Sequence, residues 1–154
     1  MSGRKTAHTT FTIERVYPGT PARVFRPLSD PTAKARWFVG PKSWTQKRRE
    51  MDFRISGREH ISGGPPDAVP HAFDAVYYDI VPNERIIYGY DMHSGETRIS
   101  VSLATVEMKP EGKGIRLIFT EQAVLLDDFN DGSSREQGTN RLLDQLSAAL
   151  AHKG

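Results

Sequence analysis

The sequence predicts a single α+β domain in which a curved antiparallel sheet wraps around one long C-terminal helix. Residues 132–154 place apolar side chains at the three-and-four spacing of one helical face. Residues 44–126, in contrast, show no helical period, only strand-like segments separated by turn residues. With 154 residues, 37% of them hydrophobic and 26% charged, the chain suits one globular domain with a sizeable core. We expect residues 1–8 to be a flexible tail and residues 9–154 to form the domain.

A strand and two short helices are expected first. Residues 9–17 alternate apolar and polar side chains, the pattern of a half-buried strand. A capping residue followed by proline then occurs twice, at Thr20-Pro21 and at Asp30-Pro31, and this pair of residues favours a helix start. Because proline lacks the N–H that a helix interior requires, Pro27 predicts the end of the first helix. The predicted helices cover residues 21–26 and 31–38.

Six further strands are expected between residues 44 and 126. Turn residues separate the segments, and the links are too short for the crossover connections that parallel strands need. Neighbouring strands should therefore pair antiparallel, and together with the first strand they make a sheet of seven. The predicted strands cover residues 45–55, 58–62, 72–81, 85–92, 97–108 and 114–125.

The last predicted element is the long amphipathic helix. Its apolar stripe consists of Thr139, Leu142, Leu143, Leu146, Ala149 and Leu150. A single stripe of this kind needs one broad apolar surface to cover it, and the concave side of a curved sheet supplies such a surface.

Composition excludes several classes of function. The chain has no cysteine, which excludes disulfides, thiolate metal sites and cysteine nucleophiles. A net charge of +2 with interspersed acids and bases gives no footing for nucleic-acid binding. No apolar run approaches the about 18 residues of a membrane span, and residues 1–8 lack the apolar region of a signal peptide. We therefore expect no membrane insertion and a cytoplasmic protein.

Several strings resemble a known family. They are FTIERVYPGTPARVFRPLSDPTAKARWF at 11–38, DFRISGRE at 52–59, FDAVYYDIVPNERIIYGYDM at 73–92, SVSLAT at 100–105, FTEQ at 119–122 and REQGTNRLLDQL at 135–146. On these strings the chain resembles the START-like or SRPBCC superfamily, the Bet v 1-like helix-grip fold. Within it, the chain is most similar to the AHSA1-like branch, which is related to the C-terminal domain of the activator of Hsp90 ATPase. Ser56 departs from this pattern, since relatives often have glycine there.

The resemblance implies the helix-grip fold and a hydrophobic cavity between the sheet and the C-terminal helix. It does not imply one reaction, because the superfamily holds binders, transporters, cyclases and co-chaperones on one scaffold. Ligand cavities are largely apolar with a few polar groups, and strand alternation indicates which side chains would line one here, although it does not separate a cavity from a solid core. The candidate ligand-binding residues are Trp37, Phe53, Tyr88, Tyr90, Met92, Leu103, Leu117, Phe119, Glu121 and Leu143.

Glu121 is the polar candidate, because it continues the alternation of Leu117 and Phe119. Without a cationic partner, burial would raise the pKa of its carboxyl and suit it to ligand binding or acid–base chemistry. Paired with Arg98 or Arg135, the carboxyl would have a lowered pKa and a structural role. A further alternative is that the carboxyl is exposed at the end of its strand.

Other motifs for chemistry are missing from the sequence. The five histidines have no metal-ligand spacing, no serine lies in a G-x-S-x-G context, and there is no G-x-x-x-x-G-K-[ST] motif. We expect no metal, no cofactor and no catalytic triad.

The leading hypothesis is a binding protein for a lipid-like, aromatic or polyketide-like small molecule. One alternative is a polyketide-cyclase-like or hydrolase-like enzyme in which Glu121 and either Tyr88 or Tyr90 form an acid–base pair. A co-chaperone that docks on a larger partner is a less favoured alternative, because the related activators carry an additional domain upstream. A homodimer is left open.

Overall fold

The computed structural model describes residues 4–127 and 132–151. Its seven strands and three helices follow the predicted order, with two short helices after the first strand and one long helix at the end. The elements are β1 (Thr6–Pro18), α1 (Pro21–Ser29), α2 (Pro31–Lys34), β2 (Thr45–Met51), β3 (Arg58–Gly64), β4 (His71–Val81), β5 (Arg85–Ser94), β6 (Thr97–Glu111), β7 (Gly114–Leu126) and α3 (Gly132–Ala151).

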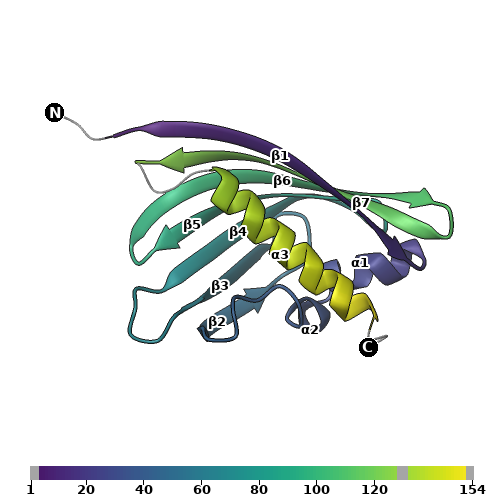
Figure 1. The fold of residues 1–154 in the computed structure, drawn as a ribbon, viewed down its shortest axis with the longest axis horizontal. Coiled ribbons are helices and arrows are strands. Elements are labelled where there is room, and N and C mark those ends of the chain that lie inside the picture. The colour runs from purple at the N-terminus through teal and green to yellow at the C-terminus, as the bar shows by residue number, and fades with distance from the viewer. Residues whose placement is uncertain (1–3, 128–131, 152–154) are drawn as a thin grey trace.

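All seven strands form one antiparallel sheet in the order β1-β7-β6-β5-β4-β3-β2. Strands β2 to β7 are hydrogen-bonded in chain order because their links are short, whereas β1 pairs with β7 at the far end of the sequence. The curved sheet wraps around α3, which crosses one face diagonally and ends near α1 (Figure 1). The predicted α+β helix-grip fold is confirmed.

The apolar stripe of α3 packs on the sheet as predicted. Leu143, Leu146 and Leu150 are all buried, and Leu146 has no exposed surface. The helix is also held by polar contacts, because Tyr17 on β1 donates its hydroxyl to the Leu143 carbonyl at 3.0 Å. Burial raises the pKa of Tyr17 to about 12, so this hydroxyl stays protonated as a donor.

Several boundaries differ from the prediction. α2 ends at Lys34 rather than residue 38, because the N–H groups of Arg36 and Trp37 donate to carbonyls three residues back, as in a turn. β1 begins at Thr6 rather than Thr9, because β7 continues to Leu126 and offers residues 6–8 a strand to pair with. α1 runs through Pro27 to Ser29, and its hydrogen bonding resumes where the N–H of Asp30 donates to the carbonyl of Arg26 at 2.9 Å. β2 ends at Met51, four residues before the predicted boundary.

Ser56 lies in the turn between β2 and β3 with a φ of 72°. This left-handed conformation is unfavourable for residues with a Cβ and favours glycine. Its N–H donates to the Tyr77 carbonyl at 2.8 Å, which ties the turn to β4. The departure from glycine at Ser56 therefore falls where the backbone itself favours glycine.

Within the two described ranges, no helix is long and apolar enough to cross a membrane.

Candidate functional site

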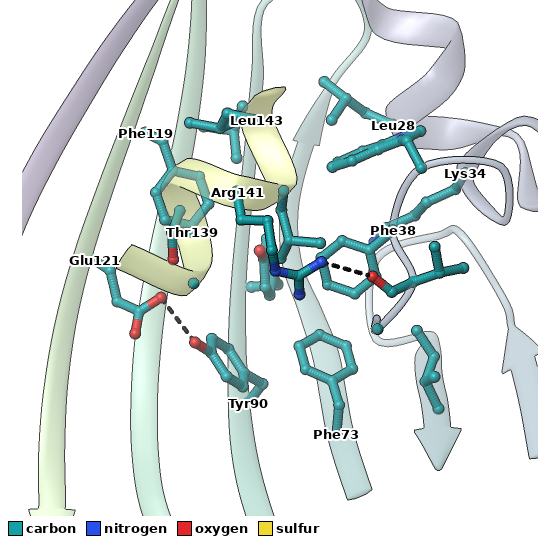
Figure 2. Close-up of a pocket in the computed structure, with 18 of the residues that line it drawn as sticks. Leu28, Lys34, Phe38, Phe73, Tyr90, Phe119, Glu121, Thr139, Arg141 and Leu143 are labelled. Carbon is teal, nitrogen blue, oxygen red and sulfur yellow. Dashed lines mark hydrogen bonds between the residues drawn. The ribbon is translucent and has the colours of Figure 1, made fainter. Parts of the chain in front are cut away.

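A cavity of about 430 Å³ lies between the concave side of the sheet and α3. This volume is within the range of small-molecule sites, roughly 300–1,000 Å³. The walls come from β3 to β7, from α3, and from the segment around α1 and α2 (Figure 2). Aromatic side chains dominate the lining; they are Trp37, Phe38, Trp44, Phe73, Tyr77, Tyr88, Tyr90 and Phe119.

Eight of the ten predicted binding residues meet in this lining. They are Trp37, Tyr88, Tyr90, Met92, Leu117, Phe119, Glu121 and Leu143. Their places in the wall follow from strand alternation on β5 and β7 and from the helical period of α3. That they contact a ligand stays a prediction.

Leu103 was expected to face the cavity, and this is wrong. Leu103 is 39% exposed on the opposite face of the sheet, and Val101 on the same outward face is 43% exposed. Ser100, Ser102 and Ala104 point inward. Strand β6 turns its small side chains inward because two of the three, Ser100 and Ser102, accept hydrogen bonds from α3. The donor is Arg135, at 2.6 Å and 3.2 Å respectively.

Phe53 was also expected in the cavity and lies outside its lining. Strand β2 has ended at Met51, so the alternation that pointed Phe53 inward no longer applies. Its ring packs instead against Phe25 and Tyr77, with centroid distances of 5.9 Å and 4.9 Å. Phe53 therefore packs against Tyr77, a residue of the cavity wall, without lining the cavity itself.

Several lining residues were not predicted. For two of them, Lys34 and Phe73, the sequence pattern indicates a position facing the cavity. Lys34 precedes Trp37 by three residues and Phe38 by four, so helical spacing places all three on one face. Phe73 shares the alternation of Tyr77 on β4. Arg135 was expected only as a possible partner of Glu121, and it also lines the cavity.

One polar cluster of the cavity is centred on Glu121, which is fully buried. Its Oε1 accepts a hydrogen bond from the Tyr90 hydroxyl at 2.7 Å, the contact drawn in Figure 2. Its Oε2 accepts from the Ser102 hydroxyl and from Nη1 of Arg135, both at 3.3 Å. Both carboxyl oxygens are therefore engaged by protein groups.

Of the two arginines proposed as partners of Glu121, the structure selects Arg135; Arg98 pairs with Asp91 at 3.1 Å instead. Pairing was expected to lower the pKa of Glu121, and this is wrong. Burial raises that pKa and outweighs the lowering by Tyr90, Arg135 and Ser102. The ion pair is weak because the guanidinium makes a single long contact and is shared with three hydroxyls.

Titration of Glu121 should therefore show a midpoint above its ordinary value of 4.5, measured by carboxyl-carbon NMR. Replacing Arg135 with methionine should move the midpoint further up, because a cation that favours the carboxylate is lost. A folded-state pKa above the unfolded value means that Glu121 stabilises the fold at low pH. That stabilisation is lost as the pH rises through the folded-state pKa. A midpoint below 4.5 would contradict this account.

The second polar cluster lies across the cavity from Glu121 (Figure 2) and contains a buried lysine. Nζ of Lys34 lies 2.7 Å from Oε1 of Glu59, which also accepts the Tyr77 hydroxyl at 2.5 Å. The ammonium also lies 4.4 Å from the ring centroid of Phe38, a cation–π contact. Burial lowers the pKa of Lys34, and nearby Arg49 lowers it further, whereas Glu59 raises it.

Polar side chains of α3 hold the segment after α2 at the edge of the cavity. Nε2 of Gln145 donates to the Trp37 carbonyl at 2.5 Å, and Nη1 of Arg141 donates to the Val39 carbonyl at 3.4 Å (Figure 2). Between this edge and Arg135, α3 presents Gly138 to the cavity, and no heavy atom lies within 4 Å of the place a Cβ would take.

Among residues 4–127 and 132–151, no group of three His, Asp or Glu side chains is placed to hold a metal ion. His60 uses Nδ1 to contact Asp74 at 2.5 Å, and His71 stacks on Trp44 with a centroid distance of 5.1 Å. These two histidines therefore have local partners rather than a shared ligand.

Comparison with known proteins gives a family match over most of the chain. The family described as "Activator of Hsp90 ATPase homolog 1-like protein" matches residues 18–151. No curated protein matches the chain.

Solved structures provide close matches. A structure of an uncharacterized protein from Rhizobium leguminosarum is 46% identical with a TM-score of 0.92, covering 97% of this chain and 98% of that one. A protein from Rhizobium loti is 39% identical with a TM-score of 0.88, covering 94% and 99% respectively. A protein from Chromobacterium violaceum is 26% identical with a TM-score of 0.78, covering 92% and 96%.

Proposed function

The chain belongs to the family of activator of Hsp90 ATPase homolog 1-like proteins, and from this premise we propose that it binds a small apolar or aromatic molecule between the sheet and α3. The observation that carries the proposal is the cavity itself, which is lined mostly by aromatic and aliphatic side chains. Two polar clusters interrupt that lining, one at Glu121 and one at Lys34. An apolar cavity with a few placed polar groups is the usual form of a small-molecule site.

The arrangement of the rings favours a flat ligand. Phe73 lies at the centre of the aromatic wall, 5.3 Å from Phe38, 4.8 Å from Tyr90 and 6.4 Å from Tyr88 between centroids. Rings at these distances support one another edge to face or tilted, which leaves other ring faces and edges for a ligand. A lipid-like, aromatic or polyketide-like molecule with a planar apolar body suits this wall.

Binding is preferred here over the two alternatives. An acid–base enzyme would use Glu121 with Tyr88 or Tyr90, but both carboxyl oxygens of Glu121 are already engaged, one by Tyr90 and the other by Ser102 and Arg135. Docking on a chaperone is suggested by the family's name alone. The cavity, in contrast, is a feature of this chain's own side chains.

The proposal predicts that an apolar dye, 1-anilinonaphthalene-8-sulfonate, binds the folded protein with one-to-one stoichiometry. Replacing Leu143 with tryptophan should abolish binding, because the larger ring projects from α3 into the cavity. The matched control is the same substitution at Leu103, on the opposite face of the sheet, which should leave binding unchanged. Fluorescence titration gives the stoichiometry, and circular dichroism confirms that both variants are folded.

Two results would overturn the proposal. The first is a native protein that binds no dye below denaturing concentrations. The second is equal loss of binding in the Leu143→Trp and Leu103→Trp variants, which would place the dye outside the cavity.

A further inference from the structure

Tyr88 contributes a hydroxyl to the cavity wall that the proposed function does not use. Tyr88 lies on β5 between two other wall tyrosines, 6.0 Å from the ring of Tyr77 and 5.9 Å from that of Tyr90. Both neighbours donate their hydroxyls to buried carboxyl groups, Tyr77 to Glu59 and Tyr90 to Glu121. The hydroxyl of Tyr88 has no hydrogen-bond partner among the described residues.

This unpartnered hydroxyl belongs to a side chain that faces the cavity. Tyr88 is only 8% exposed and forms part of the cavity lining. Its hydroxyl oxygen is not among the fully buried polar atoms that lack a partner, so this oxygen opens into the cavity. The hydroxyl is therefore within reach of a molecule in the cavity and is available to pair with it.

The surrounding charges decide which kind of partner fits. Burial raises the pKa of Tyr88 well above its usual value, and the nearby Tyr90, Glu121 and Glu59 raise it further, so the phenol keeps its proton and donates. Both oxygens of Glu121 and Oε1 of Glu59 already accept from Tyr77, Tyr90, Ser102 and the two cations. Oε2 of Glu59 is buried without a partner, but Glu59 does not line the cavity. What the wall lacks at Tyr88 is an acceptor.

The ammonium of Lys34 adds to this excess of donors. It has three N–H groups, lies 5.8 Å from the Tyr88 ring centroid and also lines the cavity. Its hydrogen bond among the described residues goes to Glu59. Tyr88 and Lys34 thus both present donors on this wall, which suits a ligand that brings oxygen acceptors of its own.

We infer that the ligand has a carbonyl oxygen on its flat apolar body and that Tyr88 donates a hydrogen bond to this oxygen. The inference rests on the proposed function and narrows its ligand class to planar ketones, quinones or esters. Tyr88 is then a specificity residue, and its hydroxyl distinguishes a carbonyl compound from a hydrocarbon of the same shape.

The test uses 9-fluorenone and fluorene, which differ by a carbonyl in place of a methylene group. Their dissociation constants are measured by displacement of the dye from the wild-type protein and from the variants Tyr88→Phe and Tyr78→Phe. The wild type should bind fluorenone more tightly than fluorene. This preference, the ratio of the two constants, should be about tenfold smaller in Tyr88→Phe, which is the effect of losing one hydrogen bond. Tyr78→Phe makes the same chemical change on the opposite, exposed face and should keep the wild-type ratio.

Two further readouts separate recognition from a structural role. The carbonyl stretching band of bound fluorenone should shift to lower frequency in the wild type and lose that shift in Tyr88→Phe. The melting temperature of Tyr88→Phe without ligand should be equal to or above that of the wild type, because no protein hydrogen bond is removed.

The outcomes distinguish this inference from the function on which it rests. If both compounds bind and Tyr88→Phe keeps the wild-type ratio, the inference is overturned and the binding function stands. A lower melting temperature for ligand-free Tyr88→Phe would show that the hydroxyl has a protein partner, which also overturns it. If neither compound nor the dye binds, the proposed function fails and the inference fails with it.

Discussion

Replacing Glu59 with glutamine should lower the free energy of unfolding by about 3–5 kcal/mol, the usual cost of leaving a buried charge without its partner. Glu59 and Lys34 have side chains only 1% and 6% exposed, so solvent does not compensate for the lost carboxylate. The substitution also places Lys34 near Arg49 with no negative charge between them. Urea denaturation at neutral pH measures the effect.

The pH dependence of this variant gives a second readout with a defined sign. Burial already lowers the pKa of Lys34. Removing the Glu59 carboxylate takes away the charge and the hydrogen bond that raise this pKa. The unfolded chain then binds more protons than the folded one below the ordinary lysine pKa of 10.5. The loss of stability should therefore shrink as the pH rises from about 7 toward that value, since Lys34 can become neutral in the folded state.

Two controls keep this prediction specific. Adding Lys34→Met to Glu59→Gln should recover most of the lost stability, because the unpaired cation is removed. Asp52→Asn breaks an exposed pair with Arg54, 54% and 70% exposed, and should cost less than about 1 kcal/mol. Equal effects of Glu59→Gln and Asp52→Asn would contradict the role given to burial.

Replacing Leu146 with alanine should cost about 2–5 kcal/mol in the same assay, as for other fully buried leucines. Leu146 packs on the sheet with no exposed surface, so the variant leaves a void in the core. Leu142 is half-buried at the edge of the cavity, and its replacement by alanine should cost clearly less. A loss below about 0.5 kcal/mol for Leu146→Ala would mean that the stripe of α3 does not pack on the sheet.

The fold could be predicted from the sequence because its signals are local. The period of α3, the alternation in the strands and the short links between them each depend on residues close together in the chain. Boundaries were less predictable where a distant partner decides them. Strand β1 gained residues 6–8 only because β7, more than 100 positions later, extends far enough to pair with them.

The cavity was predicted in part, and strand β6 shows why. In its first half the apolar Val101 and Leu103 turn outward and Ser100 and Ser102 turn inward, whereas further along the strand Val106 and Met108 turn inward. Alternation in the first half alone favours the opposite orientation of Leu103. The deciding contacts are with Arg135, more than 30 residues away, and nothing in the local pattern of β6 indicates them.

The pair of Lys34 and Glu59 was missed for a similar reason. The two residues are 25 positions apart and come from α2 and β3, so no short motif contains both. The spacing of Lys34 with Trp37 and Phe38 indicated a shared face, but a lysine on a short helix usually points to water. Burial of this lysine is explained only once Glu59 and Tyr77 are in place to receive it.

Gly138 affects the size of the cavity, because it leaves the space of a side chain empty on α3. A glycine inside a helix costs roughly 0.5–1 kcal/mol relative to alanine, and here no neighbouring atom requires the small residue. The helix therefore gives up stability to leave room over the aromatic wall. A side chain added at position 138 would enter the space over the aromatic wall, so it would reduce the volume of the cavity without changing Glu121 or Lys34.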